Sequence, residues 1–255
     1  MQDILLIDKP AGITSFDVIR RLHKKFKEQN PSATLRVKMG HAGTLDPMAT
    51  GLMIVGVGEG TKKLKEYLKL QKVYEAEVML GVKTTTGDRE GEIVEKLGSL
   101  EVEKLKKSGI QGIPNVLGGI VGKIVLPVPM YSAVKVKGKP LYKYARDRLR
   151  KGYGESKGEN IKPPEKEMEV VRLTFGGIKN VEYGIKGGES SSAKAMEGKQ
   201  ESGVIVKFEV EVTSGTYIRS LAEEIGRRLG VPATLWSLRR TKIGKFRIED
   251  AEKLE

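Results

Sequence analysis

The chain has 255 residues and a formal net charge of +13, from 46 Lys and Arg against 33 Asp and Glu. It has no cysteine, which excludes disulfides and thiolate zinc sites, and it has only two histidines, so we expect no metal and no other cofactor. We find neither a signal peptide nor an apolar run of membrane-spanning length, and we expect a cytoplasmic protein. The positive charge favours nucleic acid as the partner, although a lysine-rich surface also serves solubility alone.

The N-terminal half alternates short strands, turns and helices. A strand is predicted at 4–7, and Ser15 can cap an amphipathic helix whose apolar residues fall at 18, 19, 22 and 26. A second strand at 52–55 is followed by a glycine-rich turn and a helix that begins near Thr61. Apolar residues then alternate over 74–80, which predicts a strand with one buried face.

The C-terminal half adds a strand over 204–212 and a helix around 221–229. Ser220 and Glu223 have capping-box spacing at the start of this helix, and Gly230 marks its end. Strands and helices that do not alternate regularly indicate an α+β fold with a largely antiparallel sheet.

Two stretches interrupt this pattern. The first, about 135–165, is rich in Lys and Arg with tyrosines among them, which is typical either of a solvated surface or of a nucleic-acid surface. The second, about 177–203, is rich in Gly and Ser and predicts a flexible insertion in the sheet.

The sharpest local motif surrounds one carboxylate, Asp46, between a predicted helix and a predicted strand. Glycines at 40, 43 and 51 let a ligand approach the backbone, and Pro47 biases Asp46 away from helical geometry. An ordinary Asp-Pro turn is the alternative, and from local sequence alone it is the more common case. A glycine-rich run at 56–60 lacks the context of a nucleotide-binding loop.

Several colinear motifs resemble the TruB-type pseudouridine synthases. The resemblance extends from residue 4 to about 250 and rests on Lys9 to Ser15, Gly43 to Pro47, Lys72 to Tyr74, Pro129 to Lys135, Gly138 to Arg146, Ser214 to Leu221 and Leu238 to Thr241. It implies the pseudouridine synthase fold, a mixed and mainly antiparallel sheet with flanking helices and a central catalytic cleft. It also implies isomerisation of uridine to pseudouridine at position 55 in the T-loop of tRNA.

The resemblance also assigns roles to single residues. Asp46 is implied as the catalytic nucleophile, with Arg219 as the cation that holds it ionised. Residues implied to bind a flipped uridine, or to hold the T-loop open, are His41, Tyr74, Tyr217 and Leu238. Each has a structural alternative: a surface arginine at a helix start for Arg219, a cross-strand aromatic for Tyr74 and a satisfied turn residue for His41.

The basic residues are candidates for contact with the RNA backbone. We single out Lys9, Lys62, Lys135, Lys139 and Arg146, each of which could equally be solvated. We expect one catalytic domain, 1–255, with a thumb-like basic loop at about 135–165 and no appended C-terminal RNA-binding domain. It should bind the T-arm of tRNA as a monomer, without an obligatory protein partner.

Two questions stay open from sequence. One is whether Asp46 attacks the ribose or the uracil ring, and the other is which group acts as the general base. The rival functions are an RNA chaperone of the same fold that performs no chemistry, and a modifier of ribosomal RNA.

Overall fold

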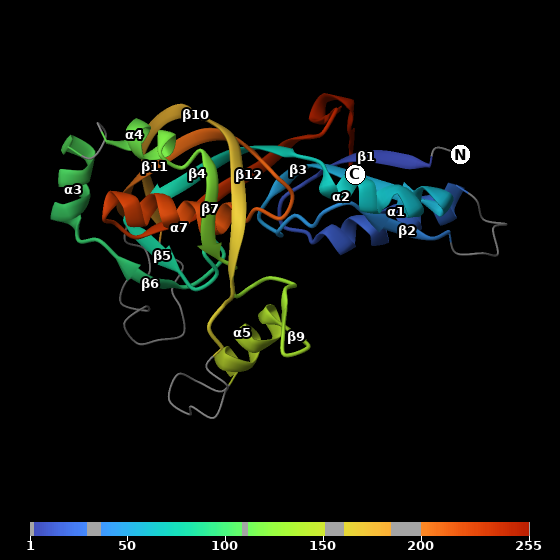
Figure 1. Ribbon diagram of the computed structural model, residues 1–255, viewed down its shortest axis with the longest axis horizontal. Coiled ribbons are helices and arrows are strands. Elements are labelled where there is room, and N and C mark those ends of the chain that lie inside the picture. Colours follow the sequence, from blue (N-terminus) through green and yellow to red (C-terminus); the bar gives the residue numbers. More distant parts are fainter. Residues whose placement is uncertain (1–2, 30–36, 109–111, 151–160, 185–199, 255) are drawn as a thin grey trace.

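The computed structural model describes residues 3–29, 37–108, 112–150, 161–184 and 200–254. Within them, ten strands form one sheet, and two further pairs of strands form small sheets of their own. Helices flank the sheet at both of its ends (Figure 1). The expected α+β architecture is therefore confirmed.

The large sheet is mixed and mainly antiparallel. Its strands in spatial order are β14 (Glu252–Lys253), β1 (Ile4–Lys9), β3 (Thr50–Val57), β12 (Ala233–Ile243), β4 (Lys72–Leu80), β11 (Gln200–Val212), β10 (Glu165–Gly184) and β7 (Gly122–Pro127). In addition, β13 (Phe246–Arg247) pairs with β12, and β2 (Met39–His41) pairs with β3. Only the pairs β1 with β14 and β3 with β12 are parallel among the described strands. The two small sheets are β5 (Val82–Thr84) with β6 (Ile93–Lys96), and β8 (Lys135–Val136) with β9 (Lys139–Pro140).

The helices pack mainly at the two ends of the sheet. They are α1 (Ser15–Gln29), α2 (Leu64–Lys69), α3 (Ser99–Ser108), α4 (Ile113–Gly118), α5 (Leu141–Arg150) and α7 (Ile218–Leu229), with 3-10 turns η1 (Gly58–Lys63) and η2 (Ile248–Asp250). Helix α7 packs against β12 and β7, and α1 packs against β2. A helix was expected near Thr61, and the chain there forms η1 followed directly by α2.

Strand β3 explains why the sequence at 52–55 is apolar throughout. Met53 and Val55 belong to the main hydrophobic cluster, whereas Leu52 and Ile54 belong to a second cluster on the opposite face. Both faces of this strand are covered, so successive side chains are all buried. The segment that leads into β3 is consequently anchored to the core.

The starts of α1 and α7 differ from the sequence interpretation. The cap of α1 is Thr14, whose hydroxyl accepts from the Asp17 N–H at 3.1 Å while the Asp17 carboxylate accepts from the Thr14 N–H at 2.8 Å. Helix α7 begins at Ile218, and the hydroxyl of Ser220 donates to the carbonyl of Pro127 at 2.6 Å instead of capping it. The expected end of α7 is present, because Gly230 adopts φ 72° after the last turn.

The two irregular stretches behave differently from each other. The described part of the basic stretch forms β8, β9 and α5, which stand away from the sheet (Figure 1). The expected insertion begins later than predicted, since 177–184 continue β10 and pair with 200–207 of β11. Residues 185–199 lie outside the described part of the chain. Tertiary pairing with a strong strand here overrides the weak strand propensity of the glycines.

Candidate active site

The loop between β2 and β3 carries Asp46, and the N-terminal segment fixes the backbone on both sides of it. The buried Ser15 hydroxyl accepts from the Leu45 N–H at 2.8 Å and donates to the Leu45 carbonyl at 3.0 Å. On the other side, the Gly12 N–H donates to the Pro47 carbonyl at 2.9 Å. The direction in which Asp46 projects is therefore set by residues far away in the sequence.

Lys9 is buried, which contradicts the expected contact with the RNA backbone. It is 0% exposed, and its ammonium donates to the carbonyls of Pro10, Ile13 and Pro47 at 2.9, 2.7 and 3.2 Å. Burial lowers the pKa of Lys9 to about 8. An ammonium has three donors, and all three are used here, so Lys9 supports the loop of Asp46 instead of binding a phosphate.

Arg219 lies in the first turn of α7 and points toward Asp46. Its Nε lies 3.0 Å from Oδ2 of Asp46, and its Nη2 donates to Oδ1 at 3.3 Å. The same guanidinium donates to the backbone carbonyls of Thr86 at 3.0 Å and Tyr131 at 2.9 Å. Its side chain is only 7% exposed. The structure thus brings together the two residues that the sequence interpretation paired, and it fixes the orientation of the arginine with contacts from three segments.

Asp88 is a site residue that sequence reasoning missed. It is 5% exposed, and its Oδ2 lies 4.0 Å from Nη1 of Arg219. The Thr86 hydroxyl at 2.6 Å and the Glu90 N–H at 3.1 Å both donate to its Oδ1, which holds the carboxylate in place. The only sequence feature that could have pointed to Asp88 is its position after Thr-Gly in a predicted turn. The same pattern also occurs in turns without a function. Arg219 therefore lies between two carboxylates.

The electrostatic environment of Asp46 is a balance of opposing effects. Burial raises the pKa of Asp46, the Arg219 guanidinium lowers it, and the neighbouring Asp88 carboxylate raises it again. The net direction is upward from the ordinary value. Arg219 is the largest influence that favours the ionised form, because its charge and its hydrogen bond both act on the same carboxylate.

Three apolar or aromatic candidates belong to the main hydrophobic core or pack against it. Tyr74 on β4 is 8% exposed and Leu238 on β12 is 6% exposed, and both belong to the main hydrophobic cluster. Tyr217, which immediately precedes α7, packs against the same cluster and is half-buried. Burial raises the pKa of Tyr217, so its hydroxyl stays protonated at neutral pH. The charges of Arg219 and Asp46 both act on the Tyr217 hydroxyl, so this tyrosine lies near the pair, whereas Tyr74 and Leu238 are core residues of β4 and β12.

His41 is the last residue of β2, and the loop that carries Asp46 follows it directly. Its Nδ1 is buried and has no hydrogen-bond partner among the described residues. Burial lowers the pKa of His41, and the nearby positive charge of Arg240 acts in the same direction. The ring is therefore neutral at pH 7.

The remaining basic candidates are spread over two places. Lys62 is 75% exposed on η1 and pairs with Glu59 at 2.5 Å. The other three lie on the β8, β9 and α5 unit, where Lys135 is exposed, Lys139 lies 4.5 Å from the ring centroid of Tyr144, and Arg146 lies 5.4 Å from that of Tyr142. Lys139 also pairs with Asp147. The unit therefore presents cations next to aromatic rings, a surface suited to an RNA strand.

Neither a metal-binding cluster nor a membrane-spanning helix is found among the described residues. No group of three or more His, Cys, Asp or Glu side chains there is arranged to hold a metal ion. None of the helices in that part of the chain combines the length and apolar character needed to cross a membrane.

Known proteins are similar to this chain over almost its full length. Residues 30–218 match the family model for the N-terminal domain of TruB family pseudouridylate synthases. The tRNA pseudouridine synthase B of Thermobifida fusca (strain YX) is 36% identical over 99% of this chain and 73% of its own length. The corresponding protein of Chloroherpeton thalassium is 37% identical over 98% of this chain and 86% of its own length.

Solved structures share the fold. The chain superimposes on a protein of the Cbf5-Nop10-Gar1 complex with a TM-score of 0.57 at 24% identity, which covers 98% of this chain and 52% of that one. An H/ACA ribonucleoprotein bound to a substrate RNA with 2'-deoxyuridine gives a TM-score of 0.54 at 22% identity, over 98% of this chain and 50% of that one. The chain spans about half the length of these structural relatives. Matched by the family model over most of its length, the chain belongs to the TruB family of pseudouridylate synthases.

Proposed function

We propose that the protein isomerises uridine to pseudouridine in tRNA, at position 55 of the T-loop. Relatives that align with nearly the whole chain carry the name tRNA pseudouridine synthase B. The observation that carries the proposal is the contact at 3.0 Å between Asp46 and a buried Arg219, whose charges both act on the neighbouring Tyr217.

The chemistry asks for one ionised nucleophile and no redox partner. Uridine and pseudouridine are isomers: the bond from C1' to N1 breaks, a bond from C1' to C5 forms, the proton on C5 leaves and N1 gains one. Asp46 supplies the electron pair for a covalent intermediate with either the sugar or the ring. Its bond to the substrate breaks again in the last step, which regenerates the free carboxylate. Arg219 favours the ionised carboxylate and keeps it aimed at the substrate.

The apolar lining accepts the target base. A base inside a stacked loop cannot reach a half-buried carboxylate, so the uridine must flip out, at a cost of roughly a few kcal/mol. Stacking on an aromatic ring offsets about 1–3 kcal/mol of that cost. Tyr74 and Tyr217 supply the rings, and Leu238 supplies an apolar side. His41, at the end of β2 and close to Asp46 in the sequence, helps to hold the T-loop open.

The β8, β9 and α5 unit grips the RNA backbone. Lys135, Lys139 and Arg146 lie on it, and contacts of this kind give affinity that does not depend on sequence and falls as salt rises. Lys62 contributes from η1 at another point of the surface. The recognised element is the T-arm of tRNA.

The direct experiment maps pseudouridine with carbodiimide in an unmodified tRNA transcript. The wild-type protein should modify the T-loop uridine, and Asp46→Asn should abolish modification while still binding the transcript. Asp250→Asn is the matched control, because Asp250 is exposed on η2 and should leave modification unchanged. Binding by the wild type without modification of any uridine would favour the RNA chaperone instead. Modification of ribosomal RNA but not of tRNA would favour the second alternative function, that of a modifier of ribosomal RNA.

The assembly and location are further parts of the proposal. We infer that the chain acts alone as a monomer in the cytoplasm, as one catalytic domain with the β8, β9 and α5 unit as its thumb. Two relatives at 36% and 37% identity are named tRNA pseudouridine synthase B, whereas the solved protein complex shares only the fold. Modification of a bare transcript by the purified protein, with a monomer mass by light scattering, is the expected result.

A further inference from the structure

Ser132 is a buried serine whose hydroxyl has no hydrogen-bond partner among the described residues. Three serines are buried in that part of the chain, and Ser132 is 7% exposed. The other two are paired, because the Ser15 hydroxyl bonds to the backbone of Leu45 and the Ser220 hydroxyl donates to the Pro127 carbonyl at 2.6 Å. Folded proteins leave few buried hydroxyls unpaired, since each one costs free energy, so this exception calls for an explanation.

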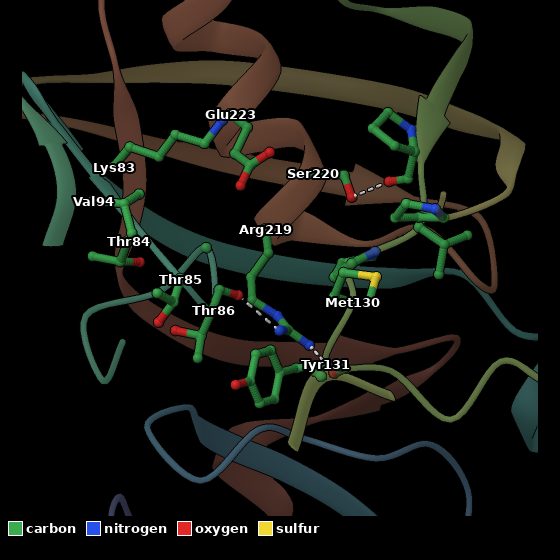
Figure 2. A pocket seen from close by; sticks show the side chains of 16 residues that line it. Lys83, Thr84, Thr85, Thr86, Val94, Met130, Tyr131, Arg219, Ser220 and Glu223 are labelled. Carbon is green, nitrogen blue, oxygen red and sulfur yellow. Dashed lines mark hydrogen bonds between the residues drawn. The ribbon is translucent and has the colours of Figure 1, made fainter. Parts of the chain in front are cut away.

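The backbone around Ser132 is held beside the active site. Nη2 of Arg219, which contacts Asp46, also donates to the Tyr131 carbonyl at 2.9 Å. Figure 2 shows Tyr131 next to Arg219, with a dashed line for this bond. On the other side, the carbonyl of Ser132 accepts from the Tyr142 N–H at 3.1 Å. Both bonds involve the backbone, so a change of the Ser132 side chain leaves them intact.

Tyr217 brings a second hydroxyl to the same place. It precedes Arg219 by two residues, on the segment that leads into α7. Burial raises the pKa of Tyr217, the Arg219 charge lowers it, the Asp46 charge raises it and the nearby Ser132 hydroxyl lowers it. The hydroxyls of Ser132 and Tyr217 are therefore neighbours, although Oγ of Ser132 bonds to none of the described residues.

Of these two side chains, Tyr217 has the greater freedom to move. Its ring is half-buried, and its backbone N–H donates to the sulfur of Met168 at 3.4 Å, which is a weak acceptor. Ser132, in contrast, is enclosed and fixed through its backbone. When a base packs against Tyr217, a small rotation of the ring is enough to bring its oxygen to the Ser132 hydroxyl.

We propose that Ser132 is a positioning residue, whose hydroxyl donates to the hydroxyl oxygen of Tyr217 when RNA fills the site. This inference rests on the proposed function, because it takes RNA as the ligand and Tyr217 as part of its binding site. Donation to that oxygen fixes the direction of the Tyr217 O–H, which then points away from Ser132 and toward the substrate. Since the bond forms only in the complex, it strengthens RNA binding without stabilising the free protein.

The first measurement is the thermal stability of the free protein. Ser132→Ala removes a hydroxyl that has no partner, so Tm should equal or exceed that of the wild type. Ser220→Ala is the matched control, because this serine is 5% exposed but its loss leaves the Pro127 carbonyl unpaired, which should lower Tm by about 2–4 °C. An equal drop in Tm for Ser132→Ala would make Ser132 a structural residue and would overturn the inference.

The second measurement is a double-mutant cycle on RNA binding. It uses Asp46→Asn, so that no pseudouridine forms, and an unmodified tRNA transcript. Ser132→Ala should weaken binding by about three- to tenfold, which corresponds to one neutral hydrogen bond. In Tyr217→Phe, which lacks the acceptor, the same substitution should change the dissociation constant by less than about twofold. Ser220→Ala should have the same effect on binding with and without Tyr217→Phe.

The conservative variant and the active protein complete the test. Ser132→Cys keeps the size but has a weak donor, so its affinity should lie between those of the wild type and Ser132→Ala. In the protein with Asp46, kcat/KM should fall in Ser132→Ala by at least the factor seen in binding. Equal losses of affinity with and without the Tyr217 hydroxyl, or no loss at all, would overturn the inference. Coupling of the two residues in a protein that forms no pseudouridine would leave it standing and would reject the proposed activity.

Discussion

Replacing Arg219 with glutamine should shift the pH dependence of the reaction to higher pH. The guanidinium contacts Asp46 at 3.0 and 3.3 Å and has a side chain only 7% exposed. A hydrogen bond to a charged group is worth roughly 1.5–3 kcal/mol. Its loss lowers the ratio of ionised to protonated Asp46 by about ten- to hundredfold at a given acidic pH. Burial and Asp88 then act on the pKa of Asp46 without opposition from Arg219.

The sign follows from which form reacts. A carboxylate is a nucleophile only when ionised, so with Asp46 in its proposed role the activity is lost as the pH falls through the pKa of Asp46. A higher pKa in Arg219→Gln moves this acid limb upward, and raising the pH should recover part of the lost rate. The assay is release of tritium from C5 of labelled uridine in tRNA, measured as kcat/KM between about pH 5 and 9.

The control is another arginine on the same helix. Arg227 is 71% exposed and pairs with Glu224 at 2.6 Å, so Arg227→Gln should leave the acid limb where it is in the wild type. If Arg219→Gln lowered the rate equally at every pH, Arg219 would act on geometry alone, and the electrostatic reasoning would be wrong.

Three other substitutions test the support of the site and the RNA surface. Lys9→Met leaves three carbonyls without their donor, which should cost about 3 kcal/mol or more and lower Tm by about 6–12 °C in thermal melts, with RNA affinity kept at low temperature. Ser15→Ala removes both bonds to Leu45, so kcat should fall about tenfold with KM unchanged in steady-state kinetics. Lys135→Gln should reduce the salt slope of RNA binding by about one, whereas Lys123→Gln should not.

Elements and site residues could be predicted from the sequence where the type and spacing of side chains distinguish them. Apolar spacing located α1, β3, β4 and β11, and the resemblance to a family singled out Asp46 and Arg219, which the structure brings into contact. Composition or spacing could not have paired residues 173 positions apart. The resemblance could do so because it covered both segments.

Hydrogen bonds from side chains to backbone carbonyls could not be predicted from the sequence. The carbonyls of Thr86 and Tyr131 hold Arg219, and every residue has a carbonyl, so sequence does not mark the ones that matter. Lys9 was misassigned for a related reason, because a lysine with internal acceptors looks like any surface lysine in sequence. Asp88 was missed because it acts through Arg219 rather than through a motif of its own.

The place of β12 in the sheet has a consequence for synthesis of the protein. Strands β3 and β4 come early in the chain, yet β12 lies between them and is made from residues 233–243. At about 5–20 residues per second, a ribosome needs roughly 8–30 s to add the intervening residues. During that time the edges of β3 and β4 that will face β12 have no partner, and unpaired edges invite association with other chains. Chains interrupted before residue 243 should therefore aggregate rather than retain partial activity.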